Sequence, residues 1–286
     1  MRSGCGSKPL SSALLEAWFR FDPQPQCCHS ERSEEPALAF QRLLGTLLIL
    51  VWFALPTGLA EAFQSPGQPG NKPPVPATLE TTLAAMDRAA ARFSSVTGNL
   101  EYTKVTVIVN DRSTERGTIS FEKAKGKTRV LLAFREPAEK YVLFEGSQVS
   151  FYRPKIAEVQ EYDLAQRQGL VEQFLLLGFG TAGSELEKAY RIAWRGEESL
   201  DPGTPGRAVH LELTPKSAQG SARLKQIELW LSPENWQPVQ QKFWEPSGDY
   251  LIARYSGLKL NTKIPAKNFK LPLRGKVKTV RPQGGS

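Results

Sequence analysis

The sequence predicts a single α+β domain built on an antiparallel sheet of about eleven strands. Three observations lead to this fold class. Apolar residues at the beginning of the body keep the spacing of one helical face, alternating β-branched and aromatic residues fill most of the remaining chain, and turn signals separate these runs closely. Strands at such short intervals pair as hairpins, and a sheet of that length must curl.

The first element of the body is an amphipathic helix. Five apolar residues recur at helical intervals: Leu79, Leu83, Met86, Ala90 and Phe93. This spacing predicts a helix over residues 79–94, with Thr78 as its N-cap. A second helical pattern covers residues 166–179 and is apolar around most of its circumference.

Strand patterns occupy most of the remaining body, and turn residues such as Gly126 and Pro137 separate them. The predicted strands cover residues 100–109, 114–123, 127–134, 141–144, 149–152, 159–164, 190–195, 209–213, 224–231, 239–244 and 250–260.

The residues in front of the body indicate export. An uncharged apolar run of thirteen residues follows Arg42 and precedes Pro56 and the small-x-small sequence Ala60 to Ala62. This is the layout of a Sec-type signal peptide, which we assign to residues 43–62 with cleavage near Ala60–Ala62. The run is shorter than the roughly 30 Å hydrocarbon core requires, so an uncleaved membrane anchor is the less favoured alternative.

Two further segments are expected to lie outside the fold. Signal peptides usually begin a few residues before their apolar core, so residues 1–42 are an anomalous preface. Our hypothesis is that translation begins at a later, non-ATG codon, because the next methionine is Met86. Residues 63–78 contain five prolines and are predicted to be a flexible linker. The folded domain is therefore expected over residues 79–286.

The composition of the body argues against catalysis. All three cysteines precede residue 43, which excludes disulfides and cysteine-ligated zinc from the body. His210 is the one histidine after His29, which leaves little material for a metal site or a Ser-His-Asp triad. The sequence Gly126-Lys127-Thr128 lacks the earlier glycine of a phosphate-binding loop. We expect a binding protein without metal or cofactor, and not an enzyme.

The positive charge is concentrated near the C-terminus. The 286 residues carry a formal charge of +8, and nine Lys or Arg without any Asp or Glu occur from Arg254 to Ser286. The residues allow three interpretations: a nucleic-acid patch, a surface attracted to an anionic membrane or a transporter, and a solvated outer face of the sheet. Because the chain carries an export signal, we expect no nucleic-acid partner.

The order of motifs resembles that of the periplasmic outer-membrane lipoprotein carrier family, LolA, over about residues 79–281. The matching motifs are Gly117-Thr118-Ile119-Ser120-Phe121-Glu122-Lys123, then Pro137 with Val142-Leu143-Phe144-Glu145-Gly146, then Phe151-Tyr152-Arg153-Pro154, then Leu211-Glu212-Leu213-Thr214-Pro215-Lys216, and finally residues 252–260 with Asn261, Ile264, Phe269, Pro272 and Gly275. Where the family usually has Arg-Pro, this chain has Lys123-Ala124, and Arg129 replaces a tryptophan.

The resemblance implies an unclosed, strongly curved antiparallel half-barrel covered by a helical lid. The segment 170–179 fits a lid that lies between the sheet and a ligand, and it fits an ordinary core helix equally well. It implies a monomeric periplasmic carrier that takes acylated lipoproteins from an inner-membrane transporter and passes them to an outer-membrane acceptor. A rival implication is a lipid-binding or lipoprotein-sensing protein of the same fold. Each buried CH₂ contributes about 0.8 kcal/mol, so a carrier of acyl chains needs a large apolar surface.

Residues for cargo contact follow from lid membership and from alternation along the strands, which does not reveal which strand face is concave. We expect contact from Leu83, Met86, Ile119, Phe121, Leu143, Phe151, Leu170, Phe174, Leu177, Ile227, Leu229 and Leu231. The family arginine that latches the lid corresponds to Lys123, which keeps the charge but loses the planar fork of donors. Lys123 is therefore the latch candidate, and the lid is expected to be held more loosely there or elsewhere.

Overall fold

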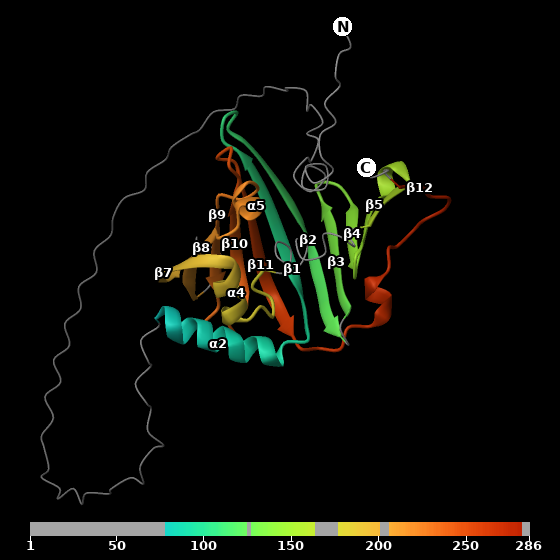
Figure 1. Cartoon of the computed structure of the whole chain (residues 1–286). Coiled ribbons are helices and arrows are strands. Elements are labelled where there is room, and N and C mark those ends of the chain that lie inside the picture. Colours follow the sequence, from blue (N-terminus) through green and yellow to red (C-terminus); the bar gives the residue numbers. More distant parts are fainter. Residues whose placement is uncertain (1–77, 125–126, 164–176, 201–205, 282–286) are drawn as a thin grey trace, which may run out of the picture. The chain divides into compact units, whose positions relative to one another are not determined.

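The structure, a computed structural model, describes residues 78–124, 127–163, 177–200 and 206–281, all within one compact unit (Figure 1). The predicted preface, signal peptide and nearly all of the linker lie outside these residues, as do Leu170 and Phe174. Among the described helices, none has the length and apolar character needed to cross a bilayer.

The first described helix, α2 (Leu79–Arg92), begins where the sequence predicts. The Thr78 backbone N–H donates to Thr81 Oγ1 at 2.8 Å, and the Thr81 N–H donates to Thr78 Oγ1 at 3.2 Å. This reciprocal capping box satisfies N–H groups that a helix start leaves without partners. The helix ends at Phe93, whose ring packs 5.2 Å from that of Phe121.

The body is one sheet of twelve strands in the order β12-β6-β5-β4-β3-β2-β1-β11-β10-β9-β8-β7. Its strands are β1 (Ser95–Thr106), β2 (Asp111–Ala124), β3 (Lys127–Glu136), β4 (Lys140–Glu145), β5 (Gln148–Arg153), β6 (Glu158–Asp163), β7 (Tyr190–Ser199), β8 (Arg207–Pro215), β9 (Gln226–Leu231), β10 (Pro238–Trp244), β11 (Tyr250–Leu260) and β12 (Lys278–Val280). β12 and β7 are the two edges, so the curved sheet is not closed (Figure 1). The predicted half-barrel is confirmed.

Two details differ from the sequence prediction. β12 was not predicted, and it pairs in parallel with β6, whereas every other described pair is antiparallel. Residues 177–179, the described end of the second predicted helix, form a turn in which Gly178 has φ +90°. The short helices are α4 (Gly183–Ala189), α5 (Ala218–Ser221) and the 3-10 turns η1 (Pro154–Ile156) and η2 (Ala266–Phe269).

The two faces of the sheet differ in what covers them. The inner face carries Ile119, Phe121 and Leu229, and receives α2 and residues 177–183. The outer face over β3–β6 is covered by the chain after β11, where Ile264 and Phe269 pack against Leu143.

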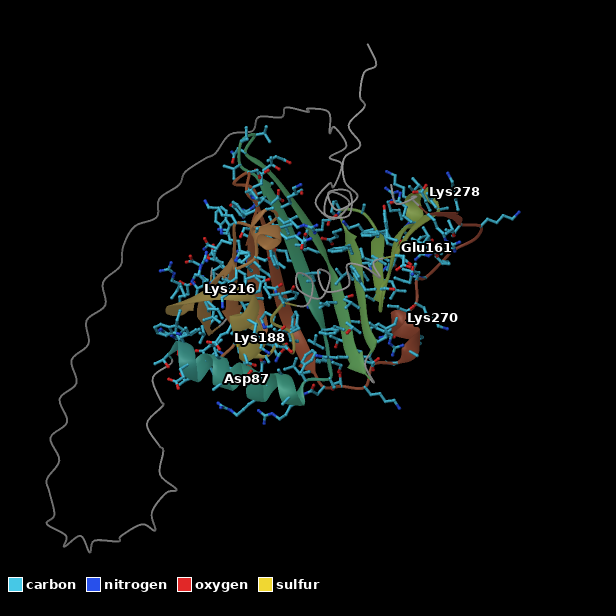
Figure 2. The ribbon with its side chains drawn as sticks, in the orientation of Figure 1. Asp87, Glu161, Lys188, Lys216, Lys270 and Lys278 are labelled. Atoms are coloured by element: carbon cyan, nitrogen blue, oxygen red, sulfur yellow. The ribbon has the colours of Figure 1, made fainter. Side chains whose placement is uncertain are left out.

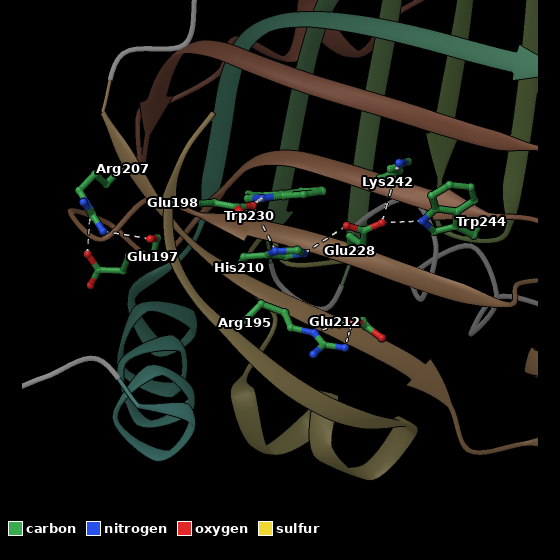
Figure 3. A network of polar contacts seen from close by, with 10 residues as sticks. All are labelled: Arg195, Glu197, Glu198, Arg207, His210, Glu212, Glu228, Trp230, Lys242 and Trp244. Carbon is green, nitrogen blue, oxygen red and sulfur yellow. Dashed lines mark hydrogen bonds and ion pairs between the residues drawn. The ribbon is translucent and has the colours of Figure 1, made fainter. Parts of the chain in front are cut away.

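A polar network occupies the outer face over β7–β10 (Figure 3). His210 stacks on Trp230 with ring centroids 4.4 Å apart and lies 3.1 Å from Glu198 and 3.2 Å from Glu228. The contact with His210, assisted by Trp244, holds the pKa of Glu228 below its usual value although burial opposes this. The charges of this half of the outer face are therefore largely matched within the sheet.

Candidate functional site

The inner face is a mostly apolar surface that crosses most of the sheet. Strand pairing places Ile119 beside Leu132, and Leu229 beside Leu211, so their side chains project to the same side of neighbouring strands. Each of these four residues is at most 4% exposed. The face also includes Val130, Phe144, Val149, Leu213, Ile227 and Leu251.

Two glycines let residues 177–183 approach α2 and Phe93 closely. A Cβ at Gly180 would lie 2.3 Å from the ring of Phe93, and one at Gly183 would lie 2.5 Å from the carbonyl oxygen of Leu83. Gly180 also has φ +59°, a conformation that L side chains seldom adopt. Residues 177–183 can therefore pack directly against α2 and its exit.

Two glutamines fix this segment on the inner face. The Gln241 side-chain amide donates to the Leu177 carbonyl oxygen, and its Oε1 accepts a hydrogen bond from the Tyr255 hydroxyl at 2.7 Å. Gln237 Oε1 accepts a hydrogen bond from the Gly180 N–H at 3.1 Å. Burial raises the pKa of Tyr255 far above its usual value, so the hydroxyl stays a donor. We call residues 177–180 with these partners the anchored segment.

Sequence reasoning missed these anchors, although a signal was present. Gln240 and Gln241 are adjacent in the middle of an apolar strand pattern, so one of them must project onto each face of the sheet. Gln241 is 1% exposed on the inner face, while Gln240 accepts a hydrogen bond from Arg254 at 2.8 Å on the outer face.

Replacing Gln241 with leucine should loosen the anchored segment. The change removes both side-chain hydrogen bonds and leaves the Leu177 carbonyl and the Tyr255 hydroxyl buried without that partner, which costs about 1–3 kcal/mol. We expect faster amide hydrogen exchange in residues 177–183. Gln240→Leu is the matched control, since it changes the neighbouring residue on the other face. Equal exchange in the two variants would contradict this role of Gln241.

A buried ion pair between Glu115 of β2 and Lys140 of β4 interrupts the apolar face. Lys140 Nζ lies 2.7 Å from Glu115 Oε2 and 4.7 Å from the Phe134 ring centroid. Burial lowers the pKa of Lys140 to about 8, against the opposing effect of Glu115, and burial raises the pKa of Glu115. The pair was not predicted.

The structure brings most of the predicted contact residues to the inner side of the sheet. Ile119 and Phe121 on β2, Phe151 on β5, and the β9 residues share the inner face. The β9 residues, Ile227, Leu229 and Leu231, are fully buried. Leu83 and Met86 are buried on α2, and Leu177 is buried in the anchored segment.

One predicted residue and the latch candidate lie away from this group, and two more predicted residues are not described. Leu143 projects to the outer face, against Ile264 and Phe269, so its assignment to the cavity is wrong. Leu170 and Phe174 lie outside the described residues. Lys123 is exposed at the end of β2, where its backbone N–H donates to the Ser94 carbonyl at 2.8 Å.

Comparisons with known proteins give a consistent picture. Residues 94–272 match the sequence model of the family described as outer membrane lipoprotein carrier protein LolA. An outer-membrane lipoprotein carrier protein from Bordetella avium is 24% identical over 179 residues, which cover 63% of this chain and 77% of that protein.

Solved structures of similar fold include the MucA/MucB complex of Pseudomonas aeruginosa and a LolA superfamily protein of Nitrosomonas europaea. The first is 17% identical with a TM-score of 0.42 and covers 68% of this chain and 61% of that chain, which is less than two thirds of its length. The second is 17% identical with a TM-score of 0.34 and covers 68% and 98%, respectively.

Proposed function

Because the chain belongs to the LolA family of outer membrane lipoprotein carrier proteins, we propose that it binds the acyl chains of lipoproteins on its inner face. It then transfers lipoproteins from the inner to the outer membrane, receiving them from an inner-membrane transporter and delivering them to an outer-membrane acceptor. It works as a binding protein and performs no chemical step on its cargo. The signal peptide of residues 43–62 directs it to the periplasm, and residues 79–286 form the carrier domain.

The observation that carries this proposal is the asymmetry of the sheet. One face is apolar from β5 to β8 and receives its own covering segment, while the sheet stays unclosed between β12 and β7. Because the sheet is not closed, the anchored segment can move away from the inner face without breaking a closed ring of hydrogen bonds between strands. Burial of apolar chains on such a surface stabilises the complex by roughly 25 cal/mol for each Å² removed from water.

The anchored segment is held by other residues than the latch at position 123 that the resemblance implies. The exposed position of Lys123 argues for a latch elsewhere, and Gln241 with Gln237 anchors residues 177–180 directly. We propose that these neutral hydrogen bonds hold the cover when no cargo is bound. Neutral bonds contribute about 1 kcal/mol each, a strength that the insertion of an acyl chain can exceed.

The identity of the bound cargo distinguishes a lipoprotein carrier from a lipid-binding or lipoprotein-sensing protein of the same fold. The full chain should be produced in a Gram-negative host, purified from the periplasmic fraction and weighed by native mass spectrometry. We expect a monomer processed near Ala60–Ala62 with an acylated lipoprotein bound. A bound free lipid without protein favours the alternative, and a protein retained unprocessed in the cytoplasm contradicts the proposed export.

A further inference from the structure

The chain after β11 forms a second surface on the opposite side of the sheet. Its apolar side chains face inward, since Leu271 and Val277 pack on the cluster around Tyr141 and Tyr152 of the outer face. Between them the lysines project into solvent. Figure 2 shows Lys270 and Lys278 along this segment, and Lys188 and Lys216 at the other end of the sheet.

Most cations of this segment have no carboxylate partner among the described residues. Its two arginines are paired, Arg274 with Glu139 at 3.4 Å and Arg281 with Glu161 at 2.9 Å, and Arg254 within β11 is paired with Glu101 at 3.6 Å. Its five lysines and Lys259 at the end of β11 are all exposed and form no ion pair within 4.0 Å among the described residues. We call these residues the lysine strip: Lys259, Lys263, Lys267, Lys270, Lys276 and Lys278.

The surroundings do not neutralise the strip. Near the strip, the carboxylates of Glu139 and Glu161 are already paired with Arg274 and Arg281. The Glu158 carboxylate accepts a hydrogen bond from Arg153 at 2.6 Å. The pKa of Glu158 is lowered mainly by hydrogen bonds from Gln160 and Arg153, and the charge of Lys278 contributes least. The other half of the outer face is different, because Arg195 and Lys242 are each paired with a glutamate there (Figure 3). The lysine strip is thus a run of six exposed cations without a carboxylate partner among the described residues.

The strip lies beside two exposed apolar side chains. Leu273 within the segment is 55% exposed, and Ile156 in η1 is 56% exposed. Ile156 is close to the strip because the N–H of Lys278 donates to the carbonyl of its neighbour, Ala157, at 2.8 Å. Lysines around isolated apolar side chains suit the surface of a bilayer. The ammonium groups can stay among the lipid head groups while the apolar side chains reach the acyl chains.

We propose that the lysine strip docks the protein on the surface of a bilayer that contains anionic phospholipid. Lysine ammonium groups are compact point charges without the planar fork that recognises one carboxylate or phosphate in a fixed geometry. Six of them spread along an extended segment suit a plane of mobile phosphates better than a single acidic partner site. This docking goes beyond the proposed function and does not depend on which cargo the inner face binds.

The attraction should be moderate and sensitive to salt. A lysine close to an anionic membrane surface raises the partition coefficient about fivefold, so loss of two should lower it about 25-fold when both contact the bilayer. The attraction falls off within a Debye length of about 10 Å at 0.1 M salt. A protein held in this way binds a membrane reversibly and can leave it again.

The test is co-sedimentation of the purified, processed protein with vesicles. One set contains phosphatidylcholine alone, and the other also contains phosphatidylglycerol. The strip variant carries Lys267→Gln and Lys270→Gln. Its matched control carries Lys188→Gln in α4 and Lys225→Gln just before β9, which remove the same charge from exposed positions near the β7 edge of the sheet, away from the strip. Circular dichroism verifies that both variants are folded.

We expect the wild type and the control to bind the anionic vesicles at low salt and to release them at high salt, while the strip variant binds at least about tenfold more weakly. If both variants bound the anionic vesicles equally weakly, binding would depend only on the net charge of the protein, which would overturn the proposal. Equal binding to neutral vesicles would also overturn it. So would a strip variant that binds the anionic vesicles as tightly as the wild type.

Discussion

Replacing Phe151 with glutamate is expected to weaken the binding of an acylated lipopeptide by more than about tenfold while the sheet remains folded. Phe151 is half-buried, shares the inner face with Val142, and contacts Tyr162 edge to face at 5.7 Å. It lies on β5, away from the fully buried inner-face residues of β8 and β9, so a carboxylate can reach solvent when no cargo is bound. An acyl chain on this face would have to desolvate that charge. The measurement is a titration with a fluorescent acylated peptide.

The neighbouring residue provides a matched control. Ser150 is paired with Leu143 and therefore projects to the outer face. Ser150→Glu adds the same charge one residue away but on the other side of the sheet, and binding should stay close to that of the wild type. Weakening by both variants would point to a general effect of charge on β5. No weakening by Phe151→Glu would place the acyl chains elsewhere.

Replacing Lys140 with methionine is expected to lower the free energy of unfolding by about 3 kcal/mol. The variant leaves Glu115, which is 9% exposed, buried without its cation. The double variant Glu115→Gln with Lys140→Met should recover most of the loss, because two neutral side chains of similar volume remove the cost of burying charge. Urea unfolding of the four proteins gives the coupling energy. A double variant as unstable as the single one would contradict this explanation.

The same pair predicts a pH dependence with a defined sign. The pKa of Lys140 is lowered from 10.5 to about 8 in the folded protein, so between these values the unfolded chain binds more protons at this site. The contribution of Lys140 to stability should therefore increase as the pH rises from about 8 to about 10. The double variant should lack this increase. Unfolding by urea at several pH values measures the difference.

The sequence predicts those parts of the fold whose patterns repeat over many residues. The helical spacing from Leu79 to Phe93 and the capping Thr78 are local features, and α2 begins at the expected residue. β12 escaped prediction because it has only three residues, two of them polar, and is held by its parallel pairing with β6. That pairing depends on a partner more than a hundred residues earlier, and no local pattern carries it.

The site was predictable only in part, for a physical reason. Alternation assigns a strand residue to one of two faces, but it identifies the buried face only when the other face is polar. Leu143 was assigned wrongly because Ile264 and Phe269 cover the outer face too, which makes β4 apolar on both sides. Gln241 and Lys140 were overlooked because polar residues in strands usually face solvent, whereas here the partners Tyr255 and Glu115 allow their burial.

Photo-crosslinking gives the sharpest test of whether acyl chains lie on the inner face of the sheet. A lipopeptide with a diazirine on an acyl chain would be bound to the purified protein, irradiated, and its attachment sites mapped by peptide mass spectrometry. We expect attachment on the inner face, at Ile119, Phe121 or Phe151, and competition by unlabelled lipopeptide. Attachment confined to the outer face around Leu143 and Phe269 would show that the inner face is not the binding surface.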